Sequence, residues 1–151
     1  METDKMVVEL EGFSIAIDTG LVAGIKEVEQ LPFMPGQKGL VSGIISLRNE
    51  PVTVINIHRA FGIASAGSEN ERPGPRKIIV INDKGRLLGI DIGSSVVSFL
   101  WGEELKGKVT MHEGRYIKGR IEGKKGPIRL IDPGALFDEA SRILSTEGES
   151  A

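Results

Sequence analysis

The sequence contains no cysteine, one tryptophan, one tyrosine and no long hydrophobic run. Without cysteine there are no disulfide bonds, thiolate metal ligands or cysteine nucleophile. No segment approaches the ~20 apolar residues of a membrane-spanning helix. The first residues are polar, without the apolar run of a signal peptide. These absences predict a cytoplasmic protein with no direct membrane insertion.

Neither sign of charge is in large excess. Nineteen Lys and Arg face 21 Asp and Glu, so the net charge of the 151 residues is -2. Domains that bind nucleic acid are usually basic, and we therefore expect no nucleic-acid partner. Hydrophobic residues make up 40% of the chain, which is enough for the core of one compact domain.

Glycine is abundant. Its 20 copies in 151 residues are nearly twice the share of roughly 7% in an average chain. They separate short segments rich in β-branched residues. Strands are expected at residues 7–10, 13–17, 25–31, 42–47, 52–57, 77–81, 86–92, 96–101, 116–121 and 128–131. Many short strands joined by tight turns predict barrels or a sandwich rather than a parallel α/β sheet.

Residues that are typical of turns and helix caps predict how the strands are connected. Asn49 can adopt the left-handed conformation that a hairpin turn between residues 47 and 52 requires. Asn56 can cap a short helix that ends at Phe61. Residues 64–75 are rich in Ser, Gly, Glu and Pro, which indicates a flexible loop.

The last segment predicts a helix. Asp132 is a suitable N-cap and Pro133 suits the first helical position. The apolar residues then share one face: Leu136, Phe137, Ala140, Ile143 and Leu144. Residues 146–151 are polar and are expected to form a flexible tail.

Motifs for catalysis and metal binding are absent. His58 and His112 have no second histidine at ligand spacing, so we expect no zinc site. Residues 119–125 lack the spacing and the Ser or Thr of a phosphate loop. There is no G-x-S-x-G elbow. We expect no cofactor and no enzymatic activity.

One motif keeps an enzymatic alternative open. Asp18-Thr19-Gly20, with a hydrophobic-Gly segment at residues 87–91, resembles retroviral-type aspartic proteases. That chemistry needs two copies of Asp18 in a homodimer, sharing one proton. The same tripeptide is favoured where a strand ends in a turn, which needs no catalysis.

Trp101 is the only tryptophan, and it ends an apolar run. A single tryptophan in such a run is more often part of the core than of a contact surface. We therefore favour a core position for Trp101, although aromatic residues also anchor interfaces.

Residues 39–57 carry the most specific pattern, because hydrophobic-x-Gly-hydrophobic-hydrophobic-x-Leu-Arg precedes a strand that ends at Asn56. This pattern resembles the signature of CheW-type chemotaxis adaptor domains. The resemblance extends more loosely from about Val7 to Leu144. Three residues depart from the usual pattern: Ser46 replaces Asn, Asn49 replaces Gly, and Asp91 stands where the family is often apolar.

The resemblance implies a mainly β fold of two intertwined SH3-like five-stranded barrels with a short C-terminal helix. Residues 1–151 would form one CheW-like domain. Its first subdomain would span about residues 19–82, and its second would combine about 6–18 with 83–145.

The resemblance also implies a function in binding rather than catalysis. Its expected partners are the regulatory domain of a CheA-type histidine kinase and the cytoplasmic tip of a methyl-accepting chemoreceptor. Five residues match the family's contact positions: Ile25, Gly43, Arg48, Gly89 and Val97. Arg48 could equally brace its own hairpin through an internal salt bridge, and both glycines could be pure backbone requirements. An adaptor of a pilus-type pathway and an unrelated SH3-like peptide-binding module remain alternatives, although aromatic residues are only 5% of the chain.

Overall fold

The computed structural model describes residues 4–10, 12–29, 41–61, 75–93, 95–105, 109–114, 116–123 and 126–150. The predicted flexible loop at 64–75 lies outside these residues, apart from its last position.

The described part of the chain forms eleven strands and four helices. The strands are β1 (Lys5–Leu10), β2 (Phe13–Asp18), β3 (Val22–Val28), β4 (Val41–Leu47), β5 (Glu50–Asn56), β6 (Arg76–Asp83), β7 (Arg86–Gly93), β8 (Val96–Leu100), β9 (Val109–Gly114), β10 (Ile117–Gly123) and β11 (Gly126–Ile131). The helices are the 3-10 turn η1 (Thr19–Leu21), α1 (Ile57–Ala60), α2 (Gly102–Leu105) and α3 (Pro133–Ser150).

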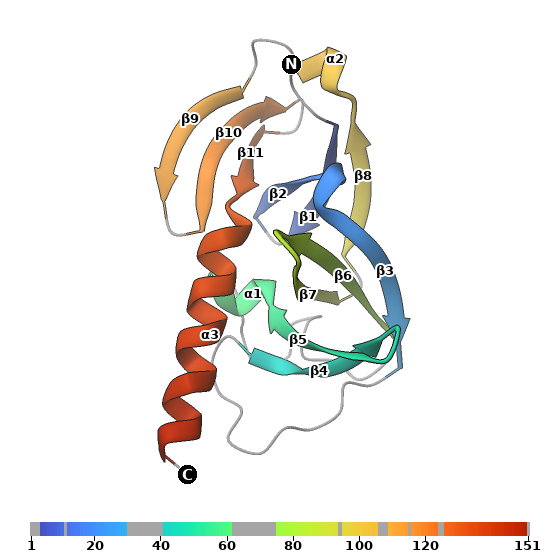
Figure 1. Cartoon of the computed structure of the whole chain (residues 1–151). Coiled ribbons are helices and arrows are strands. Elements are labelled where there is room, and N and C mark those ends of the chain that lie inside the picture. The colour runs from blue at the N-terminus through green and yellow to red at the C-terminus, as the bar shows by residue number, and fades with distance from the viewer. Residues whose placement is uncertain are drawn as a thin grey trace.

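The strands form two sheets, each belonging to one SH3-like barrel (Figure 1). One sheet has five strands in the order β3-β6-β7-β5-β4, and the other has six in the order β8-β1-β2-β11-β10-β9. The predicted mainly β fold with a C-terminal helix is confirmed. The second sheet has one strand more than predicted: the largely polar strand β9 pairs with β10, and its sequence carries no strand pattern.

The strands that make up each sheet can be compared with the predicted subdomain boundary. The N-terminal strands β1 and β2 join the strands of the C-terminal half, and β2 pairs in parallel with β11. The predicted boundary near residue 82 falls between β6 and β7, which are hydrogen-bonded along their length. The sheets therefore favour a boundary after Gly93. The structure also continues α3 to Ser150, through most of the segment predicted as a flexible tail.

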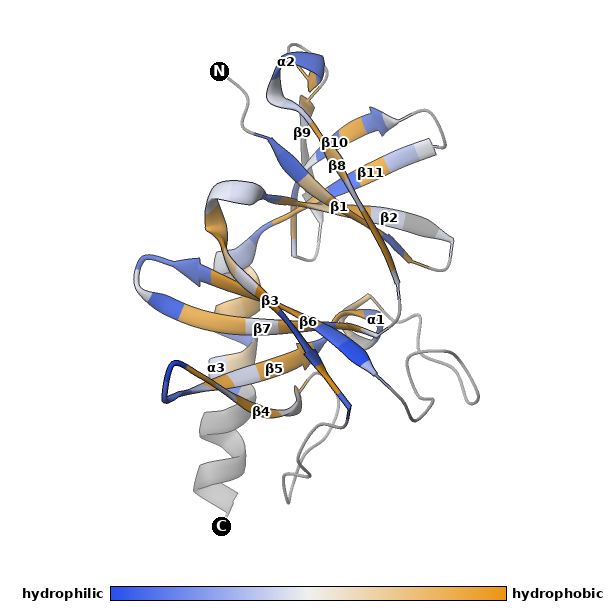
Figure 2. Cartoon of the chain, turned by 90° about the vertical axis from the view of Figure 1, so that its right-hand side faces the viewer, coloured by the Kyte–Doolittle hydropathy of each residue, from blue (hydrophilic) through white to orange (hydrophobic). Residues whose placement is uncertain are grey.

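The two barrels share one hydrophobic core. Val8 and Ile17 of the six-stranded sheet, Ile79 and Ile90 of the five-stranded sheet, and Leu136 of α3 are buried in a single cluster. Figure 2 shows that apolar residues recur along the strands of both sheets. Burial of one continuous apolar surface favours a fixed arrangement of the two barrels.

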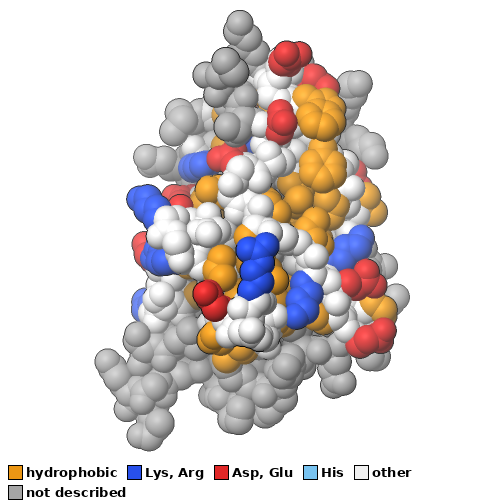
Figure 3. All heavy atoms as spheres, turned by 45° about the vertical axis from the view of Figure 1, so that its right-hand side comes forward, with side chains coloured by type: hydrophobic (Ala, Val, Ile, Leu, Met, Phe, Trp, Pro, Cys, Tyr) orange, Lys and Arg blue, Asp and Glu red, His pale blue; other side chains and the backbone are white. Residues whose placement is uncertain are grey.

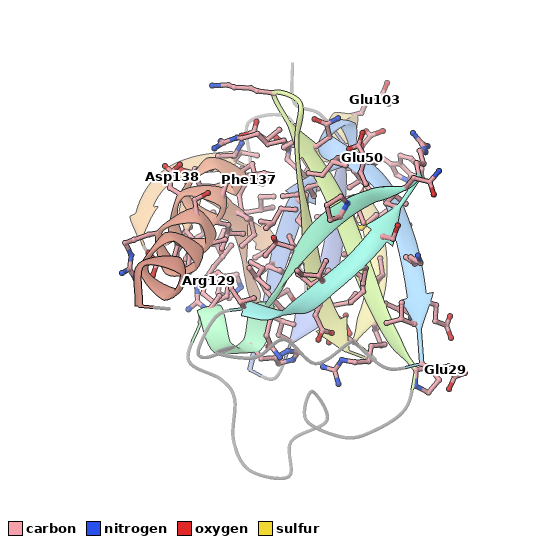
Figure 4. The ribbon with its side chains drawn as sticks, turned by 60° about the horizontal axis from the view of Figure 1, so that its bottom comes forward. Glu29, Glu50, Glu103, Arg129, Phe137 and Asp138 are labelled. Atoms are coloured by element: carbon pink, nitrogen blue, oxygen red, sulfur yellow. The ribbon has the colours of Figure 1, made fainter. Side chains whose placement is uncertain are left out.

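Helix α3 connects the barrels. Asp132 is its N-cap as predicted, since its Oδ1 accepts a hydrogen bond from the amide of Ala135 at 3.3 Å. Figure 4 shows Phe137 on the side of α3 that faces the strands. The Arg86 guanidinium, from the five-stranded sheet, lies 4.6 Å from the centre of the Phe137 ring. A helix that follows β11 of one sheet thus packs against the other.

Two tight hairpin turns have left-handed backbones. Arg48 and Asn49 have φ angles of 52° and 68°, and Lys84 and Gly85 have 55° and 84°. Two consecutive positive φ angles are typical of the turn type that matches the twist of antiparallel strands. The prediction that Asn49 adopts this conformation is confirmed.

Candidate protein-protein interface

The edge strands β3 and β8 carry exposed apolar side chains. Among the described strands, each has one hydrogen-bonded neighbour in its sheet: β6 for β3, and β1 for β8. Figures 1 and 2 both place the two strands on the same side of the molecule. Edge strands with exposed apolar side chains commonly mark sites of association.

Strand β8 presents an apolar strip, here defined as Val97, Phe99 and Trp101. Alternation along the strand places Val97 and Phe99 on one face, and Trp101 follows the end of the strand at the same spacing. Val97 is half-buried against the core shared by the two barrels, while Phe99 is 51% and Trp101 58% exposed. Figure 3 shows hydrophobic side chains gathered over β8. The β8 strip therefore extends the shared core outward to solvent.

The outer edges of the five-stranded sheet border a groove, here called the β3–β4 groove. Nζ of Lys26 on β3 donates a hydrogen bond to the carbonyl oxygen of Ser46 on β4 at 2.7 Å. Val28 and Ile44 contribute to its apolar lining, and its volume is about 610 Å³.

Ile25, the predicted contact residue on β3, is 50% exposed.

Arg48 occupies the turn between β4 and β5. Its side chain is exposed, and within the described parts of the chain it makes no ion pair or hydrogen bond. An internal salt bridge bracing the hairpin therefore has no partner among the described residues. Asn49, the next residue in the turn, lines the β3–β4 groove, so Arg48 lies beside this groove and is accessible to a partner.

Gly43 and Gly89 are buried and lie on either side of one residue. Val54 on β5 is in register with Gly43 on β4 and with Gly89 on β7. A Cβ at position 89 would lie 2.9 Å from Cγ2 of Ile78 and 3.0 Å from Cγ2 of Val54, which is closer than side chains pack. These glycines lie inside the sheet, so a partner cannot contact them directly. They can affect binding only through the shape of the strands.

The structure thus separates the five predicted contact residues. Ile25 and Arg48 are exposed, and both belong to the five-stranded sheet. Gly43 and Gly89 belong to the same sheet but are buried. Val97 lies on β8 of the other sheet, where it begins the β8 strip.

Asp18, the residue of the protease alternative, forms ion pairs with two lysines. Its Oδ1 lies 2.5 Å from Nζ of Lys5, and its Oδ2 lies 3.3 Å from Nζ of Lys118. Residues 87–91 lie in the other sheet, on β7. A catalytic dyad needs two carboxylates that share a proton, whereas both oxygens of this carboxylate face ammonium groups. The geometry favours the strand-end turn over the protease.

Asp91, the departure from the family pattern, forms a buried ion pair. It is 1% exposed, and Nε of Arg76 lies 3.0 and 2.9 Å from its two carboxylate oxygens. Its Oδ1 also accepts a hydrogen bond from the amide of Gly93 at 2.9 Å. A charge can occupy this core position because its lone pairs are satisfied.

His58 is buried at the start of α1, and among the residues described no group of three or more His, Asp or Glu side chains could hold a metal ion. Within the same residues, no helix is both long and apolar enough to cross a membrane.

Phe99 and Trp101 are exposed aromatic residues in the described part of the chain, and neither was predicted as a contact. The favoured core position for Trp101 is wrong, since its side chain is 58% exposed, and Phe99 was not singled out. Their spacing from Val97 was a usable signal, because positions 97, 99 and 101 share a face of a strand. Val96 and Leu100 make the opposite face apolar as well, so alternation alone does not tell which face is exposed.

Two SH3-like barrels on a shared core, with apolar side chains on exposed edge strands, define a β-rich protein built for binding. The sequence matches the CheW-like domain over residues 4–141, and the chain belongs to this family.

Among solved structures, the chain is similar to the crystal structure of the scaffolding protein TtCheW from Thermoanaerobacter tengcongensis. The sequences are 18% identical, the match covers 87% of this chain and 90% of the other, and the TM-score is 0.69. This similarity concerns the fold. The search of curated proteins found no match.

Proposed function

We propose that this protein is a non-enzymatic cytoplasmic adaptor that couples methyl-accepting chemoreceptors to a CheA-type histidine kinase. The β8 strip is the observation that carries the proposal. An exposed tryptophan and phenylalanine beside a half-buried valine resemble the aromatic anchors of protein interfaces. Membership of the CheW-like family supplies the class of partner.

In this proposal the receptor tip contacts the β8 strip together with Ile25 of β3. Both edge strands face the same side of the molecule, so one elongated partner can reach both (Figures 1 and 2). The contact would bury the apolar surface of Phe99 and Trp101, which are each more than half exposed in the free protein.

The kinase regulatory domain in turn docks at the β3–β4 groove, with Arg48 at the end of this surface. The guanidinium of an exposed arginine offers a planar fork of donors for a carboxylate or carbonyl group of a partner. Two separate surfaces allow one adaptor to bind both proteins at once. Each contact can be weak when many adaptors act together in an array.

The test measures binding of the purified chain to a receptor cytoplasmic fragment and, separately, to a kinase regulatory domain from the same organism. Trp101→Ala should weaken receptor binding about tenfold or more, as expected for an interface anchor. Val96→Ala is the matched control, because Val96 is 60% exposed on the opposite face of the same strand. It should leave receptor binding unchanged.

Arg48→Ala should weaken kinase binding while the fold remains intact. Lys84→Ala is its control, because Lys84 is exposed in the other hairpin turn with a φ of 55°. Equal binding by Arg48→Ala and Lys84→Ala would remove Arg48 from the interface. Unfolding of Arg48→Ala alone would show that Arg48 is structural.

The pilus-type adaptor is the second candidate, since its surfaces would be the same and only the partners would differ. If neither chemotaxis partner binds the wild-type chain, while a kinase of a pilus-type pathway does, the pathway in the proposal is wrong and the adaptor function stands.

A further inference from the structure

Strand β7 ends in a β-bulge, at the point where the chain leaves the five-stranded sheet for β8 of the six-stranded sheet. Gly93 pairs with Lys77 of β6, whereas Asp91 pairs with Ile78. Ile92 is therefore an extra residue on β7, and it is fully buried in the core that the two barrels share. A bulge bends its strand and redirects the chain that follows, which here is β8.

The side chain of Asp91 holds this bulge. Its Oδ1 accepts the hydrogen bond from the amide of Gly93, two residues later, which is the local bond by which aspartate and asparagine stabilise turns. Gly93 has a left-handed φ of 61°. The amide of Ser95 donates a hydrogen bond to the carbonyl oxygen of Ile92 at 3.1 Å, so the residue before β8 is tied to the bulge.

Arg76 in turn holds Asp91. It is the first residue of β6, the strand beside β7, and its side chain is 11% exposed. Its Nε bonds to both carboxylate oxygens. The carboxylate of Asp91 thus joins β6 to the bulge, and it cannot turn away from Gly93 without leaving a buried charge without its partner.

The side chains of β8 do not select its register by themselves. In the structure β8 pairs with β1, and Val97 lies opposite Val8. Val96 and Leu100 make the other face of β8 apolar as well, so a register shifted by one residue would still present apolar side chains on both faces. Such a shift moves every side chain to the opposite face of the strand. Phe99 would then take the place of Leu100 and leave the exposed face.

We propose that Asp91, held by Arg76, is a positioning residue that sets the register of β8 and thereby the face on which the β8 strip lies. The bulge takes up one residue of the chain before β8. Without it, each residue of β8 would move on by one place along β1. The consequence for receptor binding rests on the proposed function, whereas the register is a property of the free chain.

The test compares two double variants of the full-length chain. Arg76→Met with Asp91→Leu removes the ion pair without leaving a buried charge, and it also removes the acceptor for the amide of Gly93. Arg76→Met with Asp91→Asn removes the same ion pair, but the side-chain carbonyl of asparagine can still accept that bond. The asparagine variant is therefore the matched control for the leucine variant.

Cross-strand contacts in NMR spectra report the register without any partner. The wild-type chain and the asparagine variant should show Val8 opposite Val97. The leucine variant should show Val8 opposite Val96, as its main register or as a second set of peaks. Its affinity for a receptor cytoplasmic fragment should fall about tenfold or more, as for loss of an interface anchor, and its affinity for the kinase domain should not change. A purely structural role would lower stability without this difference between the two partners.

Three results would overturn the inference. The first is a folded leucine variant with Val97 still opposite Val8 as its one register. The second is the same shift in both variants, which would assign the register to the ion pair and not to the bond with Gly93. The third is a Gly93 amide proton that exchanges freely in the wild-type chain, a measurement for which no variant has to fold. A wild-type chain that does not bind the receptor fragment would contradict the proposed function, while the NMR comparison still decides the inference.

Discussion

The central strands β6 and β7 and the edge strands β3 and β8 contain the same types of aliphatic residue, but these residues differ in burial and in role. Residues 78–81 and 88–93 are buried without interruption, whereas exposure alternates along β3. Ile90 is fully buried, and Ile25 is 50% exposed. Position within the sheet therefore decides whether an isoleucine stabilises the fold or remains available to a partner.

The largest effect is expected from the charge buried among the central strands. Asp91→Leu should lower the free energy of unfolding by about 3–5 kcal/mol, because Arg76 would lose its buried partner. Urea denaturation measures this loss. Arg76→Met combined with Asp91→Leu should recover most of the stability, since an apolar pair leaves no uncompensated charge. A double variant as unstable as the single one would contradict this account.

Identical truncations of one central and one edge residue test the comparison directly. Ile90→Ala should cost about 2–5 kcal/mol of unfolding free energy, because it opens a cavity in the shared core. Ile25→Ala should change that free energy by roughly 0.5 kcal/mol or less, as for other surface positions. Similar denaturation midpoints for the two variants would show that the edge strand is also part of the stable core.

A pair of glycines provides a finer comparison. Gly89→Ala should cost about 1–3 kcal/mol, because the added methyl group would overlap Ile78 and Val54. Gly24→Ala on β3 is the control, since a Cβ there meets no atom within 4 Å. Thermal unfolding of both variants measures the difference. An unchanged melting temperature for Gly89→Ala would mean that the central strands adjust easily.

A small gain in stability, rather than a loss, is expected at the turn between β4 and β5. Arg48→Gly should raise the free energy of unfolding by roughly 0.5–1 kcal/mol, because glycine adopts a φ of 52° without the cost that a side chain incurs. The same change should weaken kinase binding if Arg48 is a contact. A gain of stability without loss of binding would limit the role of Arg48 to the turn.

Several elements could be predicted from the sequence because their signals are local. Asn49 adopts a left-handed φ in the hairpin turn, and Asp132 caps α3 by accepting a hydrogen bond from the amide three residues later. Strand β9 was missed because its sequence, VTMHEG, is largely polar, and its pairing with β10 is what defines it. The strands that alternate or carry long β-branched runs were all identified.

The candidate interface could be predicted only in part. The family pattern selected Ile25 and Arg48, which are exposed, together with Gly43 and Gly89, which are buried. Trp101 was expected in the core, because composition alone does not distinguish an apolar run at a sheet edge from one at a sheet centre. The missing information is the order of the strands in the sheet.

The sequence by itself determined the β-rich class, the hairpin turns, the C-terminal helix and the family, since each depends on short-range periodicity or on a contiguous motif. Only the tertiary structure decided which strands lie at the edges, which face of β8 meets solvent, and that Asp18 and Asp91 are held by lysines and an arginine. These properties depend on contacts between residues far apart in the chain, such as Asp18 with Lys118, and local sequence does not encode which distant strand becomes a neighbour.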